Sequence, residues 1–448
     1  MSVTDKLQIN PDLTRQLVSS QGNKDNGSYG WCPFREGFSA DFVTYVLAKT
    51  GLKSGCVLDP FAGTGTTLFA ASNAGLSATG IELLPYGQVV ISALRDVGVS
   101  DKKDLADGIK RFSEARSWER AGETIPFYHL PITRGAFPPE TERQLCRYRY
   151  DACRVHNIVL GRVLGLAALS VLEEISYTRK DGQYLRWDSR SGHSAGKTFH
   201  KRHIASFTQA IQSKLARIEA DLLAGAVPDG HKGRVSLIKG SCLQIMGLLA
   251  PASFDGIITS PPYCNRYDYT RTYALELALL GESADAVKSL RQAMLSCTVE
   301  NLSKTDLTGY FSADVYAAAK TAFEAQKDLA EIVAKLIFCR ATGMLNNPKI
   351  TVLVYNYFFE MSLVIAQAAV LLKEGAPFVM VNDNVQYQWI PIPVDLILSD
   401  FAQHVGFDVE AIWVVPHGKG NSSQQMAKNG RQELRKCVYV WRKKRGTV

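Results

Sequence analysis

The sequence predicts an α/β fold: a Rossmann-like, doubly wound and mostly parallel sheet with two largely helical insertions. Two observations lead to this prediction. Short apolar runs that read as strands alternate with helical patterns from about residue 40 onward. The segment VLDPFAGTGTT, Val57 to Thr67, reads as a strand, a glycine turn and a helix, which is typical of a sheet that binds a nucleotide-like ligand.

The elements follow one another in a regular order. A helix is expected over Ala40–Lys49, then the strand Cys56–Phe61, the helix Thr66–Ala74 and the strand Ala78–Leu83. The later strands are expected at Val235–Lys239, Phe254–Thr259, Ala376–Asn382, Phe407–Val415 and Cys437–Trp441, with helices at Asn356–Lys373 and Val394–Val405.

Two long gaps between these elements predict inserted subdomains. The first gap, of about 130 residues, is far longer than an ordinary loop, and its apolar spacing is helical over Thr141–Ser176 and His203–Leu223. The second runs over 282–347 and is also helical in pattern. We therefore divide the chain into a mobile polar tail (1–30), the glycine-turn half of the sheet (31–97), the first insertion (98–232), a short strand segment (233–281), the second insertion (282–347) and the rest of the sheet (348–448).

Composition limits the class of protein. The 448 residues are 46% hydrophobic, with a net charge of +8, which permits a polyanionic partner without demanding one. The nine cysteines contain no CxxC pair, so we expect neither a metal site nor a disulfide framework, and a reducing, cytoplasmic location fits. The N-terminus has no apolar signal segment, and the apolar stretch Ile158–Ile175 is too short and too charged to span a bilayer. We therefore expect no membrane association.

The glycine turn is suited to hold a cofactor. Gly63 and Gly65 lack a Cβ, so a ligand can approach the backbone closely. Asp59 and Glu82 stand at the ends of successive strands, where an acidic side chain can accept hydrogen bonds from ribose hydroxyls. The pattern GxxxxGK[ST] is absent, which excludes a P-loop. Glycines that serve packing alone remain an alternative.

The segment FDGIITSPPY ends a buried strand in Ser260, two prolines and Tyr263. An exocyclic amine on a base is a poor nucleophile, because its lone pair is delocalised into the ring. The Ser260 hydroxyl and the Pro261 carbonyl can each accept one of its N–H groups, and Tyr263 offers a face on which an extruded base can stack. Taken alone, the tetrapeptide equally describes a proline-terminated strand with a buried tyrosine. Cys264 is interpreted as a small packing residue.

The two segments together resemble the amino-group DNA methyltransferases of the SPPY type, which use S-adenosylmethionine. The resemblance implies a class I methyltransferase fold and double-stranded DNA as substrate, with 31–97 as the cofactor-binding half and 233–281 as the catalytic segment. It assigns cofactor binding to Phe34, Phe38, Ser39, Asp59, Pro60, Phe61, Ala62, Gly63, Thr64, Gly65, Glu82, Ser241 and Cys242, and catalysis to Ser260, Pro261, Pro262 and Tyr263.

Serine in the first catalytic position resembles the cytosine-N4 branch of this family. Methylation of adenine N6 is the first alternative, and methylation of RNA or of a protein amide by the same fold is the second. A binding module that retains the cofactor pocket without turnover is a third, which the intact SPPY disfavours. A cognate restriction nuclease is a candidate partner, and the sequence does not set the oligomeric state.

Two segments are candidates for DNA contact. The first is the basic stretch 177–203 within the first insertion, where cations alternate with aromatic residues, and the second is the polar loop 417–436. A solvated loop and an ordinary surface hairpin are the alternatives. The predicted DNA-binding residues are Arg179, Lys180, Arg186, Lys201, Arg202, Asn421 and Ser422.

Overall fold

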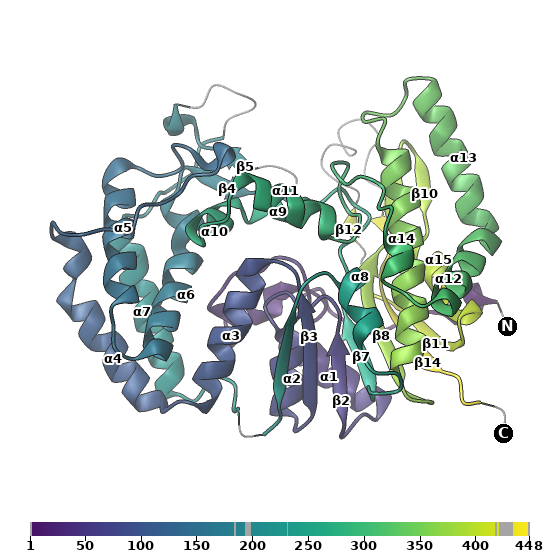
Figure 1. The fold of residues 1–448 in the computed structure, drawn as a ribbon, viewed down its shortest axis with the longest axis horizontal. Helices are drawn as coiled ribbons and strands as arrows, with labels where there is room; N and C mark the ends of the chain where they lie inside the picture. The colour runs from purple at the N-terminus through teal and green to yellow at the C-terminus, as the bar shows by residue number, and fades with distance from the viewer. Residues whose placement is uncertain are drawn as a thin grey trace.

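One eight-stranded sheet forms the centre of the computed structural model (Figure 1). The structure describes residues 2–182, 185–192, 199–230, 232–416, 419–420 and 433–446. All neighbouring strands of this sheet are parallel except β14, which runs antiparallel to both of its neighbours. The predicted doubly wound, mostly parallel sheet is therefore confirmed. In spatial order the strands are β1 (Leu7–Ile9), β11 (Phe407–Val414), β14 (Lys436–Lys443), β8 (Pro377–Asp383), β7 (Gly256–Thr259), β2 (Cys56–Asp59), β3 (Ser77–Glu82) and β6 (Val235–Lys239).

The sheet separates two hydrophobic cores. Successive residues of a strand point to opposite faces, so Val57 belongs to one core and Leu58 to the other, and Ile258 and Ile257 divide in the same way. The first core is covered by α1 (Ala40–Thr50), α2 (Thr66–Asn73) and α3 (Pro85–Val99), and the second by α8 (Cys242–Ile245), α14 (Ile350–Leu371) and α15 (Val394–His404).

The first insertion forms the helical lobe at the left of Figure 1. Its helices extend the first core, because Leu166 and Ile211 belong to the same buried cluster as Val90 of α3. The helices are α4 (Lys102–Ala115), α5 (Pro139–Cys153), α6 (Ile158–Ile175) and α7 (Phe207–Leu223). The hairpin of β4 (Thr178–Lys180) and β5 (Leu185–Trp187) lies between α6 and α7 in the chain. Short 3₁₀ turns lie at Ser117–Glu119, Pro131–Thr133 and Ser189–Ser191.

The second insertion and the residues just before it contribute to both cores, because Leu275 and Val287 belong to the first core and Val315 belongs to the second. Leu329 and Leu336 of α13 share the second core with Phe358 of α14, so the insertion packs on the central domain. The elements of this region are α9 (Tyr269–Thr272), α10 (Ala274–Leu279), α11 (Ala284–Ala293), α12 (Ala313–Ala325) and α13 (Lys327–Ala341), with the short hairpins β9 (Val385–Tyr387) with β10 (Ile390–Ile392) and β12 (Lys419–Gly420) with β13 (Glu433–Leu434). Single 3₁₀ turns lie at Met246–Leu248 and Leu307–Gly309.

The N-terminal segment corrects one prediction. The sequence predicts a mobile tail over residues 1–30, but β1 pairs in parallel with β11 at the edge of the sheet. Leu13 and Val18 are fully buried, and 3₁₀ turns form at Val3–Lys6, Ser20–Asn23 and Gly27–Gly30. The polar composition concealed this role, because a three-residue edge strand needs few apolar side chains when an adjacent strand supplies its hydrogen bonds.

Among the described residues, one helix, α14, is long and apolar enough to span a membrane by length and composition alone. Within its apolar window, however, 78% of the residues are buried inside the protein. Its hydrophobicity is therefore that of a mostly buried core helix.

Candidate functional site

The glycine turn lies at the carboxyl end of β2, between that strand and α2. Gly63 and Gly65 have φ values of 55° and 85°, a left-handed conformation that glycine adopts without strain. A Cβ at Gly63 would lie 2.8 Å from the ring of Phe34. The turn is therefore closely covered by the segment that precedes α1, and both glycines are required by its geometry.

Two buried carboxylates hold this turn. Oδ1 of Asp59 accepts hydrogen bonds from the Phe61 amide at 3.0 Å and from the Thr259 hydroxyl at 2.6 Å. Glu82 accepts the Gly63 amide on Oε2 at 2.6 Å and the Leu84 amide on Oε1 at 2.7 Å. Burial raises the pKa of Asp59 to about 6 and that of Glu82 to about 8, against the opposing effect of these hydrogen bonds.

The tetrapeptide that begins at Ser260 follows β7, which lies between β2 and β8 in the sheet. The half-buried Ser260 hydroxyl has two acceptors, the Tyr263 hydroxyl oxygen at 3.2 Å and the Val381 carbonyl at 3.3 Å. Within the described part of the chain, no group donates a hydrogen bond to Ser260 Oγ. Its lone pairs are therefore available to an incoming N–H group.

Lys436, the first residue of β14, is a site residue that the sequence analysis missed. Its ammonium lies 3.2 Å from the Tyr263 hydroxyl, 3.1 Å from Asp383 Oδ1 and 5.2 Å from the centroid of the Tyr263 ring. Burial alone would lower the pKa of Lys436, but the Asp383 carboxylate and the Tyr263 hydroxyl raise it above its ordinary value. The side chain is therefore a permanent cation beside Tyr263.

A single cavity of about 260 Å³ joins the two motifs. It opens where β2, β3 and β7 end, the position at which open α/β sheets bind ligands. Of the predicted cofactor residues, the cavity is lined by Phe34, Phe38, Asp59, Pro60, Phe61, Ala62, Gly63, Thr64, Glu82, Ser241 and Cys242, and of the catalytic ones by Ser260 and Pro262.

Four of the predicted residues stand outside the cavity lining. The Ser39 hydroxyl caps α1 by accepting the Phe42 amide, and Gly65 is the N-cap of α2. Pro261 and Tyr263 are covalent neighbours of the lining residues Ser260 and Pro262. Ser39 and Gly65 thus position the elements that line the cavity without lining it themselves.

Other lining residues had no recognisable sequence signal. Asn23, from the supposed tail, donates to the Phe38 carbonyl at 3.1 Å and the Thr66 hydroxyl at 3.3 Å. Met294 and Leu295 come from the second insertion. These residues are distant in sequence, and only the fold brings them to the cavity.

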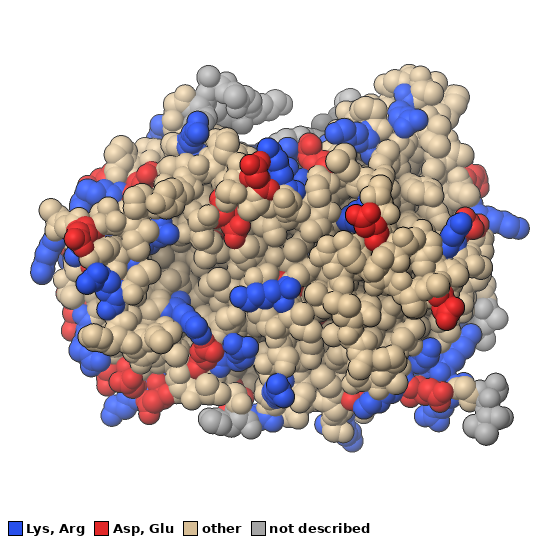
Figure 2. Space-filling model, in the orientation of Figure 1, with Lys and Arg blue, Asp and Glu red and all other residues tan. Residues whose placement is uncertain are grey.

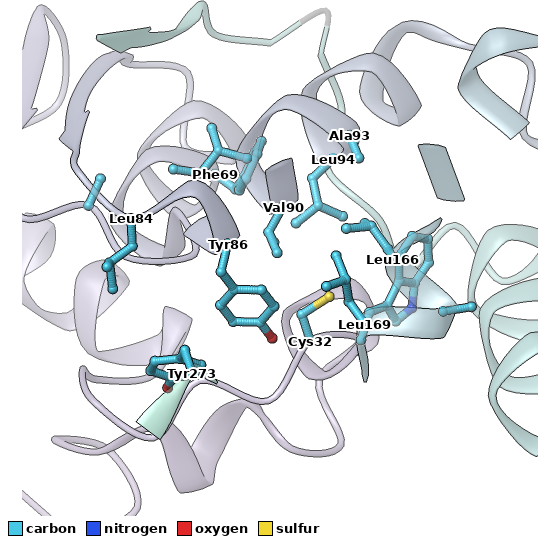
Figure 3. Packing of buried hydrophobic residues seen from close by; sticks show 14 of the residues in the cluster. Cys32, Phe69, Leu84, Tyr86, Val90, Ala93, Leu94, Leu166, Leu169 and Tyr273 are labelled. Atoms are coloured by element: carbon cyan, nitrogen blue, oxygen red, sulfur yellow. The ribbon is translucent and has the colours of Figure 1, made fainter. Parts of the chain in front are cut away.

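An aromatic stack supports the cavity from the side of Phe34. The Phe34 and Tyr273 rings lie 5.2 Å apart, and Tyr273 and Tyr86 lie 5.1 Å apart. Figure 3 shows Tyr86 of α3 between Tyr273 and Cys32. Tyr273 also donates to Glu36 at 2.5 Å, and burial raises the pKa of the Glu36 carboxyl to about 7. Phe34 and Glu36 are thus held by the first hydrophobic core.

Ser241 and Cys242 follow β6, the edge strand of the sheet, which β2 and β3 separate from β7 and its tetrapeptide. Ser241 donates its hydroxyl proton to the Ala293 carbonyl at 2.6 Å. Burial raises the pKa of the Cys242 thiol well above its ordinary value. Both therefore present a neutral wall.

The predicted DNA-binding set requires two corrections. Lys180 is only 4% exposed and pairs with Glu276 at 2.5 Å, because β4 buries Thr178 and Lys180 and exposes Arg179 between them. The Lys201 ammonium donates to the carbonyls of Glu173, Ser176 and Thr178 and so neutralises the C-terminal end of α6.

The remaining members of that set differ in accessibility. Arg179 and Arg202 are exposed, and Arg186 is exposed while paired with Asp181. Asn421 and Ser422 lie outside the described residues. The β4–β5 hairpin is fastened to the segment after the tetrapeptide, since the Asp268 amide donates to the Gly182 carbonyl at 2.9 Å.

Comparison with known proteins extends these likenesses to the whole chain. The Type II methyltransferase M.AvaI of Nostoc sp. is 43% identical over 446 residues, 98% of this chain and 91% of that protein, as is M.AvaI of Anabaena variabilis. The Type II methyltransferase M.BsoBI of Geobacillus stearothermophilus is 37% identical over 455 residues, 96% of this chain and 88% of that protein. No family model matches the chain. Because identity of this degree spans both insertions as well as both motifs, the chain belongs to the amino-group DNA methyltransferase family.

Proposed function

We propose that this methyltransferase transfers a methyl group from S-adenosylmethionine to the exocyclic amine of a base flipped out of double-stranded DNA, with cytosine N4 as the target. One observation supports this proposal above all others. Ser260 and the glycine turn at Gly63 line the same cavity. A cofactor on the turn and an amine on the serine would therefore be neighbours.

The residues of the cavity fit S-adenosylmethionine. Each oxygen of Glu82 accepts one backbone amide and retains capacity for a ribose hydroxyl. Asp59 and Glu82, which are buried, and Glu36, which is half-buried, are three acids with raised pKa values on one cavity. A cationic ligand would favour their ionised forms. When bound, the cofactor supplies an electrophilic methyl carbon.

The tetrapeptide would prepare the amine for attack. Ser260 Oγ and the Pro261 carbonyl each accept one N–H group, which draws the nitrogen lone pair out of conjugation. Lys436 remains protonated and so cannot act as a base; in this scheme the proton leaves after methyl transfer, and no base is needed. Lys436 lies over the Tyr263 ring, and in this scheme the flipped base would stack on the opposite face of that ring.

The DNA would approach across the upper edge of the molecule in the view of Figure 1. Figure 2 shows basic side chains spaced along this edge, with a few acidic ones among them. Exposed Arg179 belongs to the β4–β5 hairpin, which contacts the segment after the tetrapeptide at Gly182, and exposed Arg202 follows this hairpin in the chain. They would neutralise phosphates near the target base.

A pair of serine variants tests the catalytic assignment. Ser260→Ala should lower single-turnover methylation by about 100-fold or more, with the affinity for S-adenosylhomocysteine unchanged. Ser253→Ala is the matched control, because Ser253 precedes the opposite end of β7 and donates to the Ala250 carbonyl. Full activity in Ser260→Ala would refute the assignment.

Mass analysis of nucleosides from methylated DNA identifies the target base. N4-methylcytosine supports the proposal, whereas N6-methyladenine would move the enzyme to the other branch. Labelled cofactor offered with DNA, RNA and protein in competition tests the substrate class.

We further place the enzyme in the cytoplasm, in a restriction–modification system, so host DNA that carries its methylation should resist the cognate nuclease.

A further inference from the structure

The hairpin of β9 and β10 ends in an unusual turn. Tyr387 pairs with Ile390, so its loop consists of Gln388 and Trp389 alone. Their φ values are 44° and 68°. A two-residue turn with both φ values positive normally carries Asn-Gly or a similar pair, because a side chain is strained there. Trp389 occupies the position that favours glycine most, and it is 48% exposed.

The hairpin is anchored beside the catalytic tetrapeptide. The buried Tyr387 donates its hydroxyl to the carbonyl of Cys264 at 2.7 Å, and Cys264 directly follows Tyr263. In Figure 1 the hairpin stands next to α13, on the side of the molecule opposite the helical lobe. Trp389 is therefore a large exposed ring at a fixed tip two residues from a contact with the catalytic segment.

Two hairpins thus hold the short segment that follows the tetrapeptide. The β4–β5 hairpin contacts it at Asp268 through the Gly182 carbonyl, and the β9–β10 hairpin contacts it at Cys264. The first hairpin exposes Arg179 and Arg186 and the second exposes Trp389. One is suited to phosphates, the other to an apolar surface between bases.

We propose that Trp389 is a wedge that enters the base stack of the DNA as the target base leaves it. This inference rests on the proposed function. Extrusion of a base opens a gap in the stack and costs unstacking free energy. An indole ring has the flat, apolar surface that fills such a gap. The need for this ring explains why a strained, exposed position carries tryptophan.

A glycine substitution separates this role from a structural one. Trp389→Gly relieves the positive φ at the tip and removes the ring. If the ring only stabilised the fold, the variant would unfold more easily. We expect its thermal midpoint to equal or exceed that of the wild type, while its activity on paired DNA falls. Tyr355→Ala, which removes another 48% exposed aromatic side chain on α14, is the matched control.

The decisive experiment measures single-turnover methylation of two duplexes by each variant. In the first duplex the target base is paired, and in the second it faces an abasic site, which reduces the cost of extrusion. Trp389→Gly should be roughly tenfold slower or more on the paired duplex and within about threefold of the wild type on the abasic one. Tyr355→Ala should match the wild type on both.

A second readout does not depend on methyl transfer. DNA with 2-aminopurine at the target position should brighten with the wild type and far less with Trp389→Gly, in the presence of S-adenosylhomocysteine. Equal losses on both duplexes, or wild-type rates on the paired duplex, would overturn the wedge. If the wild type itself methylated no DNA, the proposed function would fail first, and the wedge with it.

Discussion

Gly87 of α3 allows the clearest quantitative prediction about the cofactor cavity. A Cβ at this position would lie 2.2 Å from the carbonyl oxygen of Gly63 and 2.9 Å from Cγ of Glu82. Both neighbours line the cavity, and Gly87 itself does not. Gly87→Ala therefore perturbs the glycine turn without adding an atom to the ligand site.

The magnitude follows from these distances. Ordinary contacts of a Cβ begin at 3.4 Å, so the turn or α3 must move by roughly 1 Å. Alanine gains about 0.5–1 kcal/mol over glycine within a helix, but overpacking of this kind costs about 1–3 kcal/mol. We expect a net loss in the free energy of unfolding and, because the Gly63 amide would be displaced from Glu82, at least about tenfold weaker cofactor binding.

Gly165 of α6 supplies the control, because a Cβ there has nothing within 4 Å. The same substitution, Gly165→Ala, should raise stability by about 0.5–1 kcal/mol and leave cofactor binding unchanged. Urea denaturation gives the free energies of unfolding, and calorimetric titration with S-adenosylhomocysteine gives the affinities. The reasoning is refuted if Gly87→Ala binds the ligand like the wild type and is as stable as Gly165→Ala.

Three further predictions concern charged side chains. Lys436→Met should lower the methylation rate about 10–100-fold with cofactor affinity unchanged, since it releases the tyrosine of the tetrapeptide; an unaltered rate in single-turnover assays would contradict this. Lys180→Met leaves Glu276 buried without its cation and should lower the free energy of unfolding in urea by about 3–5 kcal/mol. Arg202→Ala should leave that free energy unchanged and should reduce the slope of log DNA affinity against log salt concentration by about 1. The reverse pattern would reinstate Lys180 as a DNA contact. Burial raises the pKa of Glu82 to about 8, and a bound cation favours the ionised carboxylate. The affinity for S-adenosylmethionine should therefore rise between pH 6 and 7.5 more steeply than the affinity for S-adenosylhomocysteine, whose sulfur is uncharged. Parallel pH profiles of the two affinities in calorimetric titrations would contradict this prediction.

The candidate site was predicted best where its residues are consecutive. Asp59 to Thr64 and Glu82 line the cavity as a group, because a strand, a tight turn and a helix are determined by neighbouring residues. The basic stretch was predicted less well. A count of cations did not distinguish the outward Arg179 from the inward Lys180, since the pleat of a short strand decides which side chain reaches solvent.

The order of strands and helices along the chain, the glycine turn after β2 and the serine–proline end of β7 could all be predicted from the sequence alone. These depend on backbone preferences and on apolar spacing over a few residues. Only the tertiary structure placed Lys436 on Tyr263, 173 positions away, Asn23 in the cavity wall and Tyr387 against the carbonyl of Cys264. Such contacts arise when the sheet brings distant segments to one edge, and no local preference encodes them.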